Sequence, residues 1–288
     1  MTPANNTNPH KEAAKLTQIL DVYNGADRFD KAPVDVSQLA LDYSNQFCST
    51  EPIEKVQALK LNGCDGALVP SENASKTWAI AFNERLNVGR KNFTLAHEFG
   101  HYLLHRHLSP AKGFECSEEN IDQGIGRSIE QEADQFAAGL LMPFHDFRRQ
   151  IPSKDYVSFD QIILASARYG VSITAAILRW LECTEVRAVM IVSNEGFIKW
   201  AKSSSSALKS GVYFRTRNQM NDMPSMSLAV SADFSTMKIQ TRDQNKEVWF
   251  KQPCRESCFR DCIYDREITI LQFDEARYQD FDDCDSEE

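Results

Sequence analysis

Residues 92–106 read NFTLAHEFGHYLLHR and match the pattern H-E-x-x-H at 97–101. The apolar residues of this stretch recur at helical spacing, which predicts a helix. Residues four apart lie on one face of a helix, one turn above the other. His97 and His101 can therefore bind one metal ion, while Glu98 is set to the side, where it can act on water.

A catalytic zinc ion takes three protein ligands and keeps one position for water, so a third ligand must come from another segment. Residues 128–143, SIEQEADQFAAGLLMP, predict a second helix that ends before its proline. At about 100° per residue, Glu130 lies roughly 60° from the centre of the apolar face, and Glu132 roughly 100°. We therefore predict Glu130 as the third ligand and Asp134 as a hydrogen-bond acceptor behind a ligand histidine. Glu132 is expected to be a solvated residue.

The two segments together, with WAIAFNERLNVGRKNFTLAHE at 78–98, resemble the ImmA/IrrE family of zinc metallo-endopeptidases over roughly residues 10–185. The resemblance implies a gluzincin-like site with His97, His101 and Glu130 as zinc ligands and Glu98 as general base. The family often has Asn at the position of Asp134. Either side chain accepts a hydrogen bond, so this departure leaves the predicted site intact.

The predicted chemistry follows from these residue types. Zinc brings the pKa of a bound water towards neutrality, so that Glu98 can take a proton and later pass it to the leaving amine. Tyr102 and His105 are candidates for stabilising the oxyanion, but the sequence does not give the distance of either residue from the metal. A fourth ligand from His105 would make the zinc structural, but its position along the helix favours a packing or outer-shell role. Manganese is accepted by the same ligands.

The remaining patterns predict an α+β protein. We expect a zincin-like metallopeptidase domain made of the H-E-x-x-H helix and a small sheet. The N-cap region of this helix is expected near Thr94. Helices are expected over 11–24 and after Pro33, and strands over 53–61, 66–69 and 77–82. Two helices within 159–182 resemble a helix-turn-helix. The second offers only Arg179 as a basic residue, so we favour a structural subdomain over a DNA reader.

Beyond Val186 the pattern becomes strand-like. Strands are expected over 187–193, 196–201, 227–231, 247–250 and 266–273. The module 186–273 resembles a sensory GAF-like domain, which implies a regulatory role. Cys254, Cys258 and Cys262 could bind a metal together with Cys284, but we favour reduced cysteines near a surface loop.

The domain organisation follows from these elements. We predict a disordered leader (1–10), a zinc metallopeptidase domain (11–150), a helical subdomain (151–185), a C-terminal α+β regulatory domain (186–273) and an acidic tail (274–288). The tail carries a net charge of −7 out of −9, which leaves the body close to neutral. A nearly neutral body predicts no direct binding of nucleic acid.

Composition limits the class of protein. The chain has 288 residues, of which 42% are hydrophobic and 25% charged, as in globular proteins. The sequence contains no run of 18 apolar residues, so it predicts no membrane span. The N-terminus lacks the apolar core of a secretory signal. We therefore expect a cytoplasmic protein whose eight cysteines stay reduced, with no membrane partner.

These patterns predict a zinc-dependent endopeptidase that makes limited cuts in an intracellular protein. The family resemblance implies a helix-turn-helix transcriptional repressor as substrate, cut to relieve repression in a stress or DNA-damage response or in mobile-element control. The alternative is a non-catalytic regulator that binds a repressor or DNA through the same fold. Zinc content and the effect of Glu98→Gln distinguish the two hypotheses.

Overall fold

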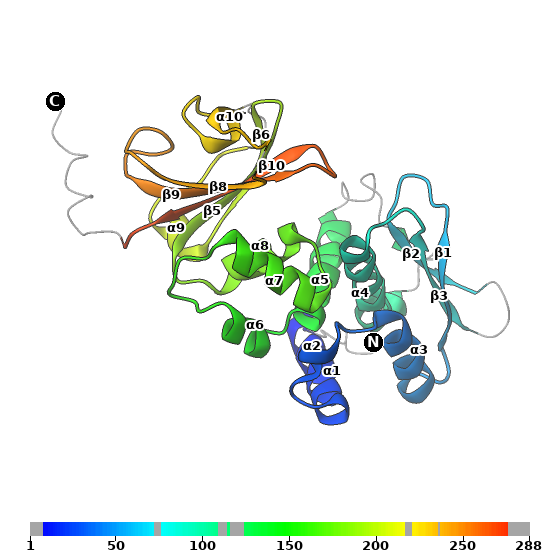
Figure 1. Ribbon diagram of the computed structural model, residues 1–288. Helices are drawn as coiled ribbons and strands as arrows, with labels where there is room; N and C mark the ends of the chain where they lie inside the picture. Colours follow the sequence, from blue (N-terminus) through cyan, green and yellow to red (C-terminus); the bar gives the residue numbers. More distant parts are fainter. Residues whose placement is uncertain are drawn as a thin grey trace. The chain divides into compact units, whose positions relative to one another are not determined.

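The computed structural model describes residues 8–71, 76–108, 114–115, 124–216, 221–235 and 237–275 (Figure 1). The chain divides into two compact units. Unit 1 comprises residues 1–147 and 164–175, and unit 2 comprises residues 148–163 and 176–288. The segment 151–185, expected to form one helical subdomain, is thus shared between the units. Each unit is described separately below.

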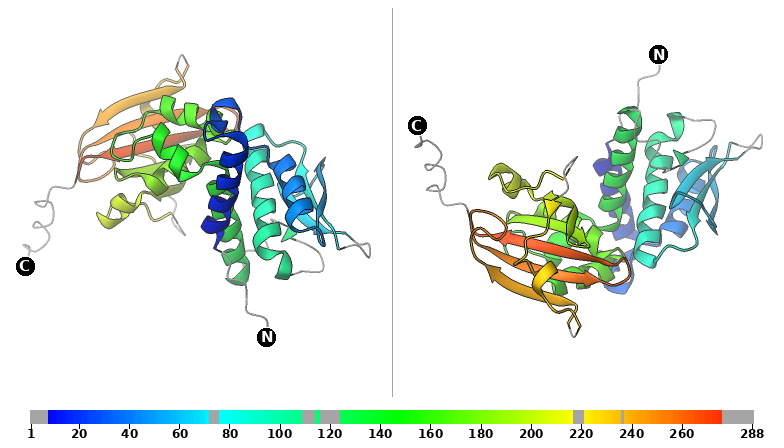
Figure 2. Two further views of the ribbon diagram at one scale, coloured as in Figure 1. Left: turned by 90° about the horizontal axis from the view of Figure 1, so that it is seen from below. Right: turned by 90° about the horizontal axis from the view of Figure 1, so that it is seen from above.

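Unit 1 combines helices with a small sheet, which confirms the α+β prediction for this part of the chain. Its helices are α1 (Pro9–Asn24), α2 (Arg28–Lys31), α3 (Val36–Phe47), α4 (Val88–His105), the 3-10 helix η1 (Arg106–Leu108) and α5 (Gly124–Leu141). Its strands are β1 (Ile53–Leu59), β2 (Gly66–Pro70), β3 (Trp78–Asn83) and β4 (Phe114–Glu115), in the order β1-β3-β2-β4. β1 runs parallel to β3, and β2 runs antiparallel to β3 and β4. In both views of Figure 2, α4 lies between α5 and the sheet.

The helix that carries H-E-x-x-H begins earlier than its apolar pattern predicts. Its N-cap is Asn87, whose side chain accepts a hydrogen bond from the backbone N–H of Arg90 at 3.0 Å. Thr94, expected near the N-cap, lies inside α4 and is buried. The first turns of α4, residues 88–93, are half-buried or exposed and mostly non-hydrophobic, so they lack the apolar periodicity that marks the rest of the helix. The early start makes α4 18 residues long.

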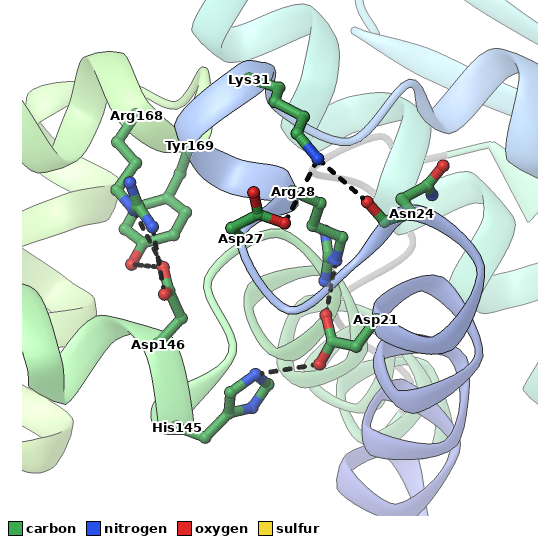
Figure 3. Close-up of polar contacts among 9 residues, drawn as sticks. All are labelled: Asp21, Asn24, Asp27, Arg28, Lys31, His145, Asp146, Arg168 and Tyr169. Carbon is green, nitrogen blue, oxygen red and sulfur yellow. Dashed lines mark hydrogen bonds and ion pairs between the residues drawn. The ribbon is translucent and has the colours of Figure 1, made fainter.

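A cluster of polar contacts ties together segments of unit 1 that are far apart in the sequence (Figure 3). Asp146 is 1% exposed and accepts hydrogen bonds from Arg168 at 2.9 Å and from the Tyr169 hydroxyl at 2.7 Å. Asp21 of α1 lies 3.1 Å from His145. These contacts join the end of α1 and the segment after α5 to residues 168–169, and so help to fix α5 in place.

Unit 2 is built on an antiparallel sheet with the order β7-β6-β5-β10-β9-β8. The strands are β5 (Arg187–Asn194), β6 (Phe197–Ser203), β7 (Asn221–Asp222), β8 (Ile239–Gln244), β9 (Cys254–Asp261) and β10 (Arg266–Phe273), and its short helices are α9 (Ser205–Lys209) and α10 (Leu228–Ser231). The central strands are buried along almost their whole length. Val189, Ile191, Leu271 and Phe273 belong to one apolar core with Trp249.

Three helices contribute residues to both units, namely α6 (Phe144–Gln150), α7 (Phe159–Tyr169) and α8 (Ile173–Cys183). α7 and α8 confirm the two helices expected within 159–182. The turn between them contains Gly170 at φ +61°, a conformation that favours glycine. Among the described residues, no single helix has the length and apolarity to cross a membrane; α7 and α8 meet these criteria only together, as a pair bent by 107°.

Two strands expected in the C-terminal module are absent from the structure at those positions. Residues 227–231 form α10 instead, whose first N–H, on Leu228, donates to the buried carboxylate of Glu256 at 2.8 Å. Residues 247–250 form a turn in which the N–H of Glu247 donates to the carbonyl of Phe250. In both cases an apolar side chain, Leu228 or Trp249, is buried without its segment pairing as a strand, so hydrophobicity alone gave the wrong element.

The cysteine-rich segment forms a strand and not a surface loop. Cys254 and Cys258 lie on β9 and are buried, while Cys262 follows the strand and is exposed. Residues four apart in a strand are separated by about 13 Å, so these two thiols cannot share a metal ion. Cys284, most of the acidic tail and residues 1–7 of the leader lie outside the described residues.

Candidate metal centre

α4 carries the two histidines into the interior of unit 1. His101 is completely buried and His97 is 8% exposed. Their positions four residues apart place the rings on one face of the helix, with ring centroids 4.7 Å apart. The two Nε2 atoms point at one another across 3.0 Å.

α5 supplies the third side chain of the group, and it can do so because α4 and α5 pack closely. A Cβ atom added at Gly100 would lie 2.9 Å from Cδ1 of Phe136 and 3.3 Å from Cα of Ala133. Glycine at this position therefore allows the helices to approach. The approach brings Oε2 of Glu130 to 3.2 Å from Nε2 of His97, and Oε1 to 3.3 Å from Nε2 of His101.

The three side chains have the geometry of a metal-binding group. One ligand atom from each of His97, His101 and Glu130 lies within 4.8 Å of the others. Zinc–nitrogen and zinc–oxygen bonds of about 2.0–2.1 Å in a tetrahedral site place the ligand atoms about 3.3 Å apart. The separations of 3.0, 3.2 and 3.3 Å come close to this value. These residues thus fit a divalent cation bound by two imidazoles and one carboxylate.

The protonation states also suit a cation. Burial lowers the pKa of His101 to about 4, although the neighbouring Glu130 opposes the shift. Burial by itself would raise the pKa of Glu130, but hydrogen bonds with His101 and His97 outweigh it and hold that pKa well below its usual value. Near neutral pH the group therefore offers a neutral imidazole on His101 and an ionised carboxylate, both of which are metal-binding forms.

Glu98 is fully buried on α4 and lies against the first residue of β2. A Cβ atom at Gly66 would come within 2.8 Å of Oε1 of Glu98 and 2.5 Å of Cγ2 of Thr94. The absence of a side chain at Gly66 makes room for the carboxylate. The sequence predicted only the start of a strand at Gly66, because a close approach of this kind leaves no local pattern.

A second row of polar residues lies behind the ligand histidines. Asp134 Oδ1 lies 2.9 Å from Nδ1 of His97, the ring atom that faces away from Glu130. His105 lies behind His101, with the two Nδ1 atoms 3.0 Å apart. Glu132, expected to be a solvated residue, keeps 38% of its side chain exposed, and its Oε2 also lies 3.1 Å from Nε2 of His105, a contact that the sequence did not predict. α5 thus presents both flanks of its apolar face to α4.

The two candidates for the oxyanion occupy other environments. Tyr102 is completely buried, and its hydroxyl donates to the backbone carbonyl of Glu51 at 2.8 Å. His105 is 3% exposed, with its ring nitrogens facing His101 and Glu132. Neither residue belongs to the group of ligand atoms among the described residues. Between α4 and α5, residues 109–113 and 116–123 lie outside the described residues.

Comparison with known proteins agrees with this site. Residues 51–181 match the family described as the IrrE N-terminal-like domain. Metallopeptidase ImmA of Bacillus subtilis (strain 168) is 31% identical over 111 residues, which make up 38% of this chain and 62% of that protein. A transcriptional regulator of Mycobacterium tuberculosis shares the fold with a TM-score of 0.56 over 92% of this chain and 76% of its own, at 12% identity.

The paired helices and the group of two histidines and one glutamate define a metallopeptidase-type domain. With the matches above, this domain belongs to the ImmA/IrrE family. The matched segment covers less than two thirds of the length of metallopeptidase ImmA. The likeness to the Mycobacterium tuberculosis protein concerns the fold alone.

Proposed function

We propose that this chain is a zinc-dependent endopeptidase with a zincin-like catalytic domain of the gluzincin type. The observation that carries the proposal is the convergence of His97, His101 and Glu130 from two helices, with the buried carboxylate of Glu98 on α4 lying next to Gly66 of β2. The first three residues would hold the metal. Manganese fits the same ligands and is the alternative cofactor.

A bound zinc ion supplies Lewis acidity, which acidifies water and polarises a peptide carbonyl. The chain's own contribution to the chemistry is then the movement of a proton. Glu98 would accept a proton from the attacking water at a carboxylate oxygen and deliver it to the nitrogen of the leaving amine. Its burial between α4 and β2 restricts its rotamers, so the carboxylate is held in one place for both transfers.

The substrate proposed here is an intracellular protein cut at a small number of sites, namely a helix-turn-helix repressor. This role implies an anti-repressor acting in the cytoplasm during a stress or DNA-damage response or in mobile-element control. Support comes from the family of the domain and not from unit 2, whose GAF-like character and regulatory role remain predictions.

The test is incubation of the zinc-loaded protein with the repressor encoded beside its gene, followed by mass spectrometry of the products. We expect one pair of fragments, which a chelator and Glu98→Gln both abolish. Gln131→Ala, an exposed change on α5, serves as the control that keeps cutting. Absence of fragments from a zinc-loaded protein, or full biological activity of Glu98→Gln, would favour the non-catalytic regulator.

A further inference from the structure

His101 is followed by a row of polar groups that leads away from the metal-binding face. Its Nδ1 lies 3.0 Å from Nδ1 of His105, and Nε2 of His105 lies 3.1 Å from Oε2 of Glu132. His105 is 3% exposed, and the Glu132 side chain is 38% exposed. The hydroxyl of Ser128 donates to the other carboxylate oxygen of Glu132 at 3.4 Å. The row therefore runs from the interior to the surface of unit 1.

The positions of the protons along this row follow from the chemistry of imidazole. A neutral imidazole has one N–H donor and one bare nitrogen, and only the bare nitrogen binds a metal. If Nε2 of His101 binds the cation, its Nδ1 carries the proton and donates to Nδ1 of His105. That atom must then be bare, so the proton of His105 sits on Nε2 and donates to Glu132. Each contact has one donor and one acceptor.

Without an acceptor beyond His105, this arrangement is no longer favoured. His105 could then carry its proton on Nδ1, facing the Nδ1 of His101. Two N–H groups cannot face each other at 3.0 Å, so His101 would take the tautomer with its proton on Nε2. In that tautomer Nε2 has no lone pair for a metal ion. The carboxylate of Glu132 thus acts on His101 through His105.

We propose that His105 and Glu132 are positioning residues that hold His101 in its metal-binding tautomer. The proposal rests on the metal site of the proposed function. It extends to His101 what Asp134 does directly for His97 at 2.9 Å. Both ligand histidines would then be oriented by carboxylates of α5, one directly and one through a second imidazole.

The experiment measures zinc affinity at fixed pH by competition with a chromogenic chelator. We expect Glu132→Ala to weaken zinc binding by about 10- to 100-fold, as loss of such a partner does. Glu132→Gln should bind zinc as the unaltered protein does, because its amide oxygen still accepts the proton of His105 and its NH2 can donate to Ser128. Gln131→Ala, the neighbouring exposed change, is the matched control.

A double variant tests whether Glu132 acts through His105. His105→Phe keeps a ring of similar shape but removes both nitrogens, so it should weaken zinc binding. Adding Glu132→Ala to His105→Phe should cause no further loss, because the route to His101 is already broken. Melting temperatures of the metal-free proteins show whether each variant folds. Two-bond ¹⁵N–¹H spectra of the zinc-loaded protein should show His105 protonated on Nε2.

Unchanged zinc affinity in Glu132→Ala overturns the proposal. Equal losses in Glu132→Ala and Glu132→Gln, additive losses in the double variant, or a proton on Nδ1 of His105 also overturn it. None of these measurements involves proteolysis. A protein with this pattern of zinc affinities that cuts nothing would therefore refute the proposed peptidase and leave the positioning role standing, and a protein that binds no zinc would refute both.

Discussion

Glu98 and Gly66 meet where α4 crosses the start of β2. A Cβ atom at Gly66 would lie 2.8 Å from Oε1 of Glu98, closer than such contacts allow. The backbone φ of Gly66 is not positive, so the requirement for glycine is one of space and not of conformation. The placement of the proposed general base thus depends on a residue in a different element.

Gly66→Ala should therefore impair catalysis more than metal binding. A displacement of the carboxylate by a fraction of an ångström to 1 Å predicts a loss of about 10- to 100-fold in cutting rate, with one zinc ion still bound. The rate of repressor cleavage and the zinc content of the same preparation check this. A Cβ atom at position 66 would also clash with Cγ2 of Thr94, which Thr94→Ser removes. The double variant Gly66→Ala with Thr94→Ser should therefore be more stable to unfolding than Gly66→Ala alone, but its cutting rate should stay low. A fully active Gly66→Ala would show that Glu98 does not need this space.

Asp134 provides a second prediction. Asp134→Ala should weaken zinc binding by about 10- to 100-fold, because Nδ1 of His97 loses the acceptor that lies 2.9 Å away. Asp134→Asn keeps an acceptor oxygen and should stay close to the unaltered protein. Chelator competition measures both. A large loss in Asp134→Asn would mean that the charge matters, and not the hydrogen bond.

The close approach of α4 and α5 provides a third prediction. Gly100→Ala would press on Phe136 and Ala133, and we expect it to lower the free energy of unfolding by about 1–3 kcal/mol and to weaken zinc binding as the helices separate. Denaturant unfolding measures the free energy of unfolding, and chelator competition measures the zinc affinity. Phe136→Leu in the same chain should restore part of the zinc affinity by making room. Unaltered zinc affinity in Gly100→Ala would show that the helix spacing does not set the site.

Unit 2 allows a test that is independent of the metal centre. Burial raises the pKa of both Cys254 and Cys258 to about 12, so at pH 8 only about one thiol in ten thousand is ionised. Iodoacetamide should label the exposed Cys262 quickly, and the two buried thiols only after denaturation. Peptide mass spectrometry over a time course reads this out. Rapid labelling of Cys258 in the native protein would contradict its place inside the sheet.

The sequence was most informative where a side-chain pattern repeats with a helical period. The spacing of His97 and His101, and the position of Glu130 on its helix, predicted side chains that the structure brings together. The start of α4 was missed because capping by Asn87 involves one hydrogen bond and no apolar pattern. A single capping residue is easily overlooked when the apolar periodicity becomes clear only further along the helix.

Contacts between separate elements were beyond the reach of periodicity. Glu132 lies on the far flank of the α5 apolar face, which made it look solvated, but the close packing of α4 brings His105 to it. Gly66 likewise gains its role from the neighbouring helix. In unit 2, the strand β9 was hidden because its cysteines and charged residues lack the alternation of a half-buried strand.

The most direct test of the account is the zinc content per chain after equilibrium dialysis, for the unaltered protein, Glu98→Gln and Glu130→Gln. If His97, His101 and Glu130 hold the ion while Glu98 only moves protons, the first two proteins retain one zinc per chain and Glu130→Gln loses most of it. Full retention of zinc by Glu130→Gln, or its loss from a folded Glu98→Gln, would contradict the assignment of ligands and base.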